Sequence, residues 1–92
     1  MIKSFADKKT EDLYNGKFIK QFSSFREKAE RKILIVDCAK TLEDLKVPHG
    51  NKLEPLIGDR QGYYSIRINE QWRVCFRWID NNAYDVTIVD YH

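Results

Sequence analysis

The sequence predicts an α+β fold, in which a short N-terminal strand and helices pack on one face of a mostly antiparallel sheet. Two patterns support this prediction. Apolar residues recur every three or four positions before Pro48 and every second position after it, and turn-forming residues separate the alternating runs. The chain has 92 residues, enough for one compact core and too few for two. We therefore expect residues 1–92 to form a single domain.

The first half of the chain is predicted to be mainly helical. Residues 2–5 suit a short first strand, and residues 7–14 suit a short helix. The clearest helix is marked by apolar positions that share one face, at Phe22, Phe25, Ala29, Ile33 and Val36. The order of elements is therefore β-α-α followed by three strands.

Local signals predict where two helices begin and end. Ser24 and Glu27 have the spacing of a capping box at the start of the clearest helix. A further short helix begins at Thr41 and ends near Val47, because Pro48 disfavours helical geometry in the residue before it.

Alternating residues predict strands at positions 63–69, 72–78 and 83–89. The run 72–78 alternates most sharply, with Trp72, Val74, Phe76 and Trp78 on one face and Arg73, Cys75 and Arg77 on the other. Residues 80–82 form the turn to the last strand, because Asp and Asn tolerate a positive φ. One face of this sheet is therefore core, and the other carries cations.

Composition excludes several classes of protein. A hydrophobic content of 42% and a net charge of +2 fit a folded globular chain. No stretch resembles a membrane span or a signal peptide, so we expect a cytoplasmic protein without a membrane partner. Cys38 and Cys75 lie far apart without ligand spacing, so the sequence predicts neither a disulfide framework nor a zinc site.

Positive charge is concentrated between Lys17 and Lys32, where six basic residues stand against two acidic ones. Such an excess attracts phosphates by releasing their counterions. Charge on a helix also serves simply to keep it soluble. Both interpretations stay open, and Lys28 and Lys32 are the candidates for nucleic-acid contacts.

Three arginines are expected on the sheet face opposite the core: Arg67, Arg73 and Arg77. A guanidinium grips a phosphate with two parallel hydrogen bonds, which suits an RNA backbone and the charge that develops during its cleavage. Ion pairing across strands, with Asp85 as an available partner, explains the pattern equally well.

The sequence closes on three titratable residues, Asp90, Tyr91 and His92. Histidine acts as a general acid or base at neutral pH, Asp90 can orient it, and Tyr91 can stack on a base or donate a proton. Terminal residues are nevertheless often inert. Alternation groups Asp90 with Tyr84 and Tyr91 with Asp85, so the three residues converge only if the strand twists or leaves the sheet near Val89.

Other catalytic patterns are absent from the sequence: it has no Gly-rich phosphate loop, GxSxG, HExxH or metal-binding carboxylate cluster. RNA offers a route without them, because its own 2′-hydroxyl attacks the adjacent phosphate. The protein then supplies only proton transfer and charge stabilisation. A hydrolase built on a strong nucleophile or a metal is therefore disfavoured.

Five short motifs follow one another in residues 50–92. They are Asn51-Lys52-Leu53-Glu54-Pro55-Leu56, Gly58-Asp59-Arg60-Gln61-Gly62, Ser65-Ile66-Arg67-Ile68-Asn69, Gln71-Trp72-Arg73 with Phe76, and Asp90-Tyr91-His92. In this order they resemble the HigB toxins of the RelE/ParE superfamily. The length and the opening Met1-Ile2-Lys3-Ser4-Phe5 fit as well, so the resemblance runs from end to end.

The resemblance implies a compact RelE-like, microbial-RNase-like toxin of a type II toxin–antitoxin system. Such a toxin enters the decoding site of the small ribosomal subunit, cleaves translated mRNA and so inhibits translation. The implied partner is a helix-turn-helix antitoxin of the HigA type, through which the complex binds operator DNA, and no metal or cofactor is expected. By position, Arg73 stabilises phosphate charge, and Asp90, Tyr91 and His92 form the end of the active site. The candidates for RNA contacts are Arg67, Arg60, Arg77, Lys52, Lys28 and Lys32.

Two positions depart from some relatives, which carry a histidine where Glu54 stands and a lysine where Ile57 stands. Glu54 is then a candidate catalytic proton acceptor, or Ile57 marks a slower enzyme. Two further functions stay open. One is a ParE-like gyrase inhibitor, which Asp90-Tyr91-His92 argues against, and the other is a non-catalytic module that binds RNA or the antitoxin.

Overall fold

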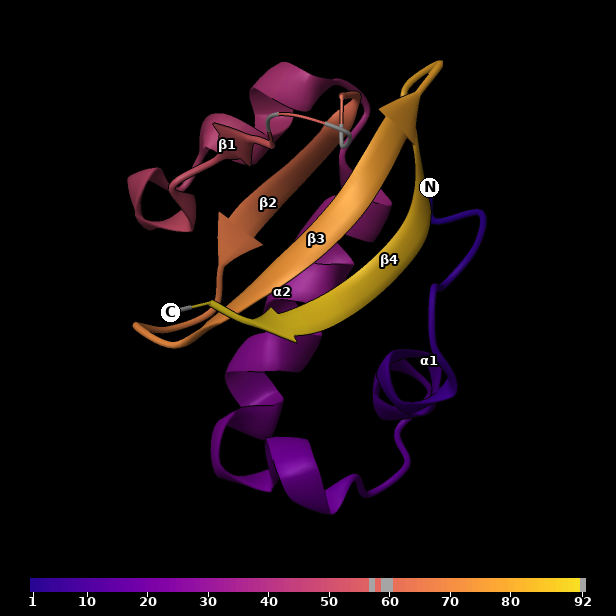
Figure 1. The fold of residues 1–92 in the computed structure, drawn as a ribbon, viewed down its shortest axis with the longest axis vertical. Helices are drawn as coiled ribbons and strands as arrows, with labels where there is room; N and C mark the ends of the chain where they lie inside the picture. The colour runs from indigo at the N-terminus through magenta and orange to yellow at the C-terminus, as the bar shows by residue number, and fades with distance from the viewer. Residues whose placement is uncertain (57, 59–60, 92) are drawn as a thin grey trace.

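Four strands form one antiparallel sheet in the order β1-β2-β3-β4 in the computed structural model, which describes residues 1–56, 58 and 61–91. The strands are β1 (Glu54–Pro55), β2 (Tyr63–Arg67), β3 (Trp72–Ile79) and β4 (Asn82–Asp90). The long helix α2 (Arg26–Cys38) lies across one face of the sheet, and α1 (Lys8–Tyr14) lies beside β4 (Figure 1). The predicted α+β architecture, with helices on a mostly antiparallel sheet, is confirmed.

The N-terminal segment lies parallel to β4, but it does not form the continuous strand predicted at residues 2–5. Ile2 pairs with Ala83 and Phe5 with Val86, each as an isolated bridge. Between the two bridges β4 bulges at Asp85, which has a φ of 54°. Its amide donates to the hydroxyl of Ser4 at 2.9 Å instead of to a backbone carbonyl. The bulge therefore interrupts the ladder that a regular first strand needs.

The same bulge changes the alternation of β4. Cys75 pairs with Thr87 but Arg77 pairs with Tyr84, so β4 has one more residue than β3 between these two pairs. Partners across a sheet share a face, and Tyr84 therefore lies on the face of Arg77. The prediction that groups Tyr84 with Asp90 is wrong, because it assumes an unbroken strand.

The core lies between α2 and the sheet. Its buried apolar side chains come from every large element: Leu13 from α1, Ala29, Ile33 and Val36 from α2, and Ile66, Val74, Phe76, Val86 and Ile88 from the strands. They include most of the predicted inner positions of the helix and of the sharpest alternating strand, and the remaining three, Phe25, Trp72 and Trp78, are partly buried and pack against this core. Because α2 packs on this face alone (Figure 1), the opposite face of the sheet, which carries Arg73, can hold a site.

The start of α2 differs from the prediction. The helix begins at Arg26, beyond the expected cap at Ser24, and no side chain caps it. The residues before it form a 3-10 helix, η1 (Lys20–Phe25). Phe22 and Phe25 pack on Trp72, with ring centroids 5.7 and 5.2 Å apart. We infer that aromatic packing, rather than a capping box, sets how the chain enters α2.

The second predicted helix is present as a 3-10 helix, η2 (Leu42–Lys46), followed by η3 (His49–Asn51). Thr41 and Asp44 form its capping box. The backbone amides of Lys40 and Thr41 donate to the Asp44 carboxylate, which holds the pKa of Asp44 below its usual range. These turns lead the chain from α2 to β1.

Thr10 joins α1 to the sheet, because its buried hydroxyl accepts the amide of Ile88 at 3.1 Å. We expect Thr10→Val, which has the same shape, to lower the free energy of unfolding by about 1–3 kcal/mol, since the Ile88 amide loses its acceptor. Urea denaturation measures the loss. Thr10→Ser is the control for hydrogen exchange at Ile88, because it keeps the hydroxyl. A Thr10→Val variant with full stability and unchanged exchange at Ile88 would contradict this role.

Candidate active site

Side chains from β1, β2 and β3 and from the residue after β4 surround an open pocket of about 330 Å³. We call it the Arg73 pocket. Its lining residues are Lys52, Glu54, Arg67, Asn69, Glu70, Arg73 and Tyr91. Five of these seven are candidates that the sequence predicted, and they come from four separate stretches of chain.

Strand register explains why these residues meet. Glu54 pairs with Ser65 across β1 and β2, and Arg67 pairs with Arg73 across β2 and β3. Ser65 and Arg67 are two residues apart on β2, so all four side chains lie on one face of the sheet. This face is opposite the one that packs on α2, as the alternation in β2 and β3 predicts.

Arg73 is the most enclosed cation of the pocket, with only 8% of its surface exposed. Its Nε donates to the hydroxyl of Ser65 at 2.9 Å, and its Nη2 donates to the carbonyl oxygens of Ser65 and Lys52. Nη1 lies 3.7 Å from a carboxylate oxygen of Glu54. The protein therefore fixes the guanidinium through Nε and Nη2, while Nη1 lies toward a carboxylate that lines the pocket.

Tyr91 completes the pocket from the end of the chain. Its ring lies 5.4 Å from the guanidinium carbon of Arg73, a cation–π distance. Its backbone amide donates to the carbonyl of Gln71 at 2.6 Å, which continues the pairing of β4 with β3 beyond Asp90. The phenol is 41% exposed, so it is accessible to a bound ligand.

A second hollow adjoins the Arg73 pocket and adds the two predicted lysines of α2. It has a volume of about 420 Å³ and is lined by Lys28, Lys32, Gly50, Lys52, Arg67, Ile68, Asn69 and Glu70. Four of these residues also line the Arg73 pocket, so the two hollows share one wall. We call this second one the lysine hollow. It carries four cationic side chains.

Lys32 contributes to the lysine hollow from a largely buried position. Its ammonium donates to the side-chain oxygen of Asn51 at 2.6 Å. Burial lowers the pKa of Lys32, and the nearby charges of Lys28 and Arg31 lower it further. The more exposed Lys28 and Lys52 are therefore better placed than Lys32 to meet a phosphate.

Some predicted residues do not join this group. Arg77 lies further along β3, where it pairs with Asp85 at 3.6 Å and with the ring of Tyr84 at 5.6 Å. Asp90 is in register with Trp72, on the face toward α2, and accepts a hydrogen bond from the Gln71 side chain at 3.1 Å. Arg77 therefore follows the ion-pair alternative, and Asp90 is held away from the Arg73 face.

Three further positions named from the sequence lie outside the described residues: Ile57, Arg60 and His92. Their assignments stay predictions. Of the two closing residues that the structure describes, Asp90 and Tyr91, it is Tyr91 that lies beside Arg73.

The structure adds three residues that the sequence did not single out. Ser65 accepts a hydrogen bond from Arg73. The sequence could have indicated it, because Ser65 is a small hydroxyl residue on the strand face that carries Arg67. The side chain of Asn69 accepts hydrogen bonds from the backbone amides of Gln71 and Trp72, both at 2.8 Å. An asparagine between two strands is typical of such a turn, so the sequence could have indicated it. Glu70 lines both hollows from that turn, and nothing in the sequence pattern indicated it.

Within residues 1–56, 58 and 61–91, no three His, Cys, Asp or Glu side chains gather in a way that could hold a metal ion. In the same part of the chain, no helix is both long and apolar enough to cross a bilayer.

Sequence comparisons relate nearly the whole chain to one family. Residues 3–92 match the family described as the RelE-like toxin of type II toxin–antitoxin system HigB. Toxin HigB-1 of Vibrio cholerae serotype O1 is 37% identical over 94 residues, which cover 100% of this chain and 98% of the relative. Endoribonuclease HigB of Proteus vulgaris is 49% identical over 41 residues, 45% of each chain.

Solved structures show the same fold at lower identity. The chain is similar to a toxin–antitoxin heterotetramer of YoeB and YefM from Staphylococcus aureus, with a TM-score of 0.57, 23% identity and 100% and 98% of the two chains covered. A YoeB dimer from the same organism gives a TM-score of 0.56 at 23% identity, over 99% and 97% of the chains.

Arg73→Lys keeps the charge but loses the planar fork that reaches Ser65 and Lys52. We expect it to lower the free energy of unfolding by about 2–3 kcal/mol. The control is Arg77→Lys on the same strand. The side chains of Arg77 and its partner Asp85 are each 41% exposed, so their ion pair should contribute less than about 1 kcal/mol. Chemical denaturation of both variants tests this, and equal losses would contradict the structural role of Arg73.

Proposed function

This chain belongs to the RelE-like HigB toxins of type II toxin–antitoxin systems, and we propose that it is a ribosome-dependent endoribonuclease that cleaves translated mRNA. The name of the Proteus vulgaris relative, Endoribonuclease HigB, supports the activity. Cleavage of messages would inhibit translation in the cytoplasm, and a HigA-type helix-turn-helix antitoxin would restrain it and carry the complex to operator DNA.

The observation that carries this proposal is the Arg73 pocket. There a carboxylate lies 3.7 Å from a guanidinium that the protein holds in place, with a tyrosine ring beside them. Lys52 and Arg67 add two more cations at the rim. A proton acceptor next to a preorganised positive charge is what RNA cleavage by its own 2′-hydroxyl requires.

In the proposed reaction, Glu54 accepts the proton of the 2′-hydroxyl as that oxygen forms a bond to the adjacent phosphorus. Negative charge grows on the non-bridging oxygens, where Nη1 of Arg73 donates to them. The bond to the 5′-oxygen then breaks, and this oxygen takes a proton from Tyr91 or His92. The products are a 2′,3′-cyclic phosphate and a 5′-hydroxyl.

The shape of the pocket supports a need for the ribosome. It is open to solvent, and a few charged groups at its rim orient a flexible single strand poorly. Orientation contributes a large part of the rate of such reactions. A message held in the decoding site of the small subunit would arrive with its backbone already ordered, so the toxin would need only to supply its pocket.

One observation favours a second candidate, a non-catalytic module that binds RNA or the antitoxin. Arg73 is engaged by Ser65 and Lys52, and the Glu54 carboxylate lies near it as an ion-pair partner. The same contacts would serve a purely structural cluster. Catalysis and structure therefore have to be separated by a substitution that preserves the fold.

Glu54→Gln is that substitution, because Glu54 is exposed and its amide analogue keeps the shape. We expect ribosome-dependent cleavage to fall by about 100- to 10,000-fold, the range for loss of a general base. Mapping of mRNA 5′ ends after induced expression measures it. Glu43→Gln is the control, since Glu43 is an exposed carboxylate on η2, outside both hollows.

Cuts within translated codons that disappear in Glu54→Gln and persist in Glu43→Gln would support the nuclease. Growth arrest with intact messages in the unaltered toxin would reject it. Accompanying DNA breaks or altered supercoiling would point instead to gyrase.

A further inference from the structure

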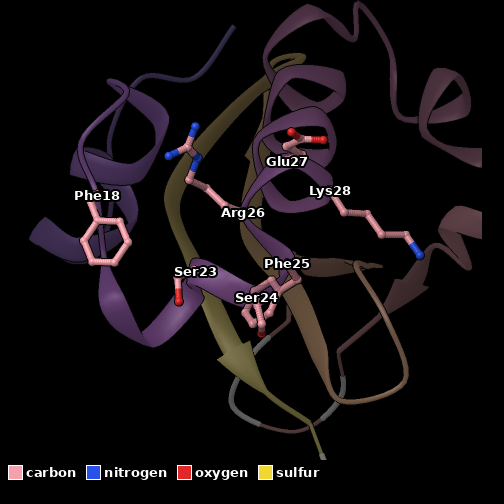
Figure 2. Close-up of a pocket in the computed structure, with 7 residues that line it drawn as sticks. All are labelled: Phe18, Ser23, Ser24, Phe25, Arg26, Glu27 and Lys28. Carbon is pink, nitrogen blue, oxygen red and sulfur yellow. The ribbon is translucent and has the colours of Figure 1, made fainter.

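A third hollow lies where η1 meets α2, and the proposed chemistry does not use it. Its volume is about 500 Å³, and its lining residues are Phe18, Ser23, Ser24, Phe25, Arg26, Glu27 and Lys28. Figure 2 shows Phe18 and Phe25 on opposite sides of this hollow. We call it the Phe18 hollow.

Phe18 is the unusual feature of this hollow. Its side chain is 68% exposed, whereas Phe22 is 3% exposed and lies in the core. Among the described residues, the ring of Phe18 has no aromatic partner and takes no part in the core cluster. Phe25 uses one face of its ring against Trp72. An exposed aromatic face beside hydroxyl and cationic groups is typical of sites that stack an unpaired base.

Lys28 connects the Phe18 hollow to the rest of the site. It lines both this hollow and the lysine hollow, which in turn shares Lys52 and Arg67 with the Arg73 pocket. The three hollows therefore lie in a row, each sharing lining residues with the next, and we call this row the track. Within the part of the chain that the structure describes, Lys28 forms no ion pair, whereas the neighbouring Arg26 is paired with Glu30 at 3.0 Å. Lys28 is thus available to an outside anion.

We propose that this track binds one strand of RNA, with its scissile phosphate in the Arg73 pocket, a phosphate on Lys28 and an unpaired base stacked on Phe18. Lys28 and Lys52 are both exposed and both line the lysine hollow, which suits contacts with successive phosphates of an extended strand. The inference rests on the proposed function and names the path that the message takes over the toxin.

Continuity with the cationic hollows favours RNA over a peptide as the occupant. A peptide segment of an antitoxin would also cover an exposed phenylalanine. Unless that peptide were acidic, it would gain little from the row of lysines and arginines that leads from that ring toward Glu54. A peptide is therefore an outcome that the test must detect.

The test measures binding of 2′-O-methyl RNA, which lacks the attacking hydroxyl, by fluorescence anisotropy. A long oligonucleotide of about nine bases reaches the Phe18 hollow, and a short one of about three fills only the Arg73 pocket. We expect Phe18→Ala to weaken binding of the long RNA by about 5- to 100-fold and to leave the short RNA unchanged. Phe18→Trp should restore the affinity, because it keeps an aromatic face.

Leu34→Ala is the matched control, since Leu34 is a half-exposed apolar residue on α2 that lines none of the three hollows. Thermal unfolding of both variants should stay close to that of the unaltered chain, because neither side chain belongs to the buried core. Equal affinity of Phe18→Ala and the unaltered chain for long RNA would overturn the proposal. Two other results would also overturn it. If Phe18→Ala lost affinity only for ribosomes without message, the hollow would be assigned to ribosomal RNA; if it lost affinity only for the antitoxin, the hollow would be assigned to that protein.

The outcome is separable from that of the nuclease proposal. If Phe18→Ala weakens binding of long RNA while the unaltered toxin leaves messages intact, the RNA track stands and the cleavage activity does not. If cleavage depends on Glu54 but RNA affinity is independent of Phe18, the nuclease stands and the track is wrong.

Discussion

The buried guanidinium of Arg73 is the interaction on which the site depends. It bonds to Ser65 on β2 and to the carbonyl of Lys52 just before β1, so one side chain ties three consecutive pieces of the sheet edge together. Lys52 has a φ of 48°, a left-handed conformation that costs an ordinary residue about 1–2 kcal/mol. The bond from Arg73 helps to offset this cost. The stability of the sheet edge and the placement of Glu54 therefore both depend on the contacts of Arg73. For this reason, loss of activity on removal of Arg73 would not prove that it is catalytic.

A second set of contacts prepares the Lys52 segment from the side of the helix. Lys32 on α2 donates to Asn51, and the Asn51 amide donates to the carbonyls of Leu45 and Val47 at 3.1 and 3.2 Å. Asn51 is fully buried, so each of these bonds satisfies a group that water does not reach. The helix thus fixes the turns before Lys52, and Arg73 fixes Lys52 itself. The cations of the lysine hollow are held by the same framework that holds the Arg73 pocket.

The sequence predicted the parts of this molecule that follow from period and register. Alternation at Trp72, Arg73 and Val74 placed the core and the cationic face on the correct sides, because a buried strand face tolerates no slip. It could not predict the bulge at Asp85, which three distant groups hold: Ser4, Tyr63 and Arg77. Nor could it separate Arg77 from Arg73, since both have the same parity and differ only in what surrounds them. Capping propensity at Ser24 failed for a similar reason, as aromatic packing on Trp72 outweighed it.

The bulge makes the spacing along β4 a determinant of the site in its own right. Counted from Tyr84, a regular strand would place Asp90 on the face of Arg73. The extra residue at Asp85 places Tyr91 there instead, because a shift of one residue exchanges the two faces of a strand. A strand of the same length without the bulge would thus bring Asp90 to the face of Arg73, whereas loss of the extra residue itself would leave Tyr91 there. Homologous tails of equal length that differ in this bulge are therefore not equivalent, even when the closing tripeptide is identical. Alignment of such toxins should be anchored on the bulge and not on the C-terminus.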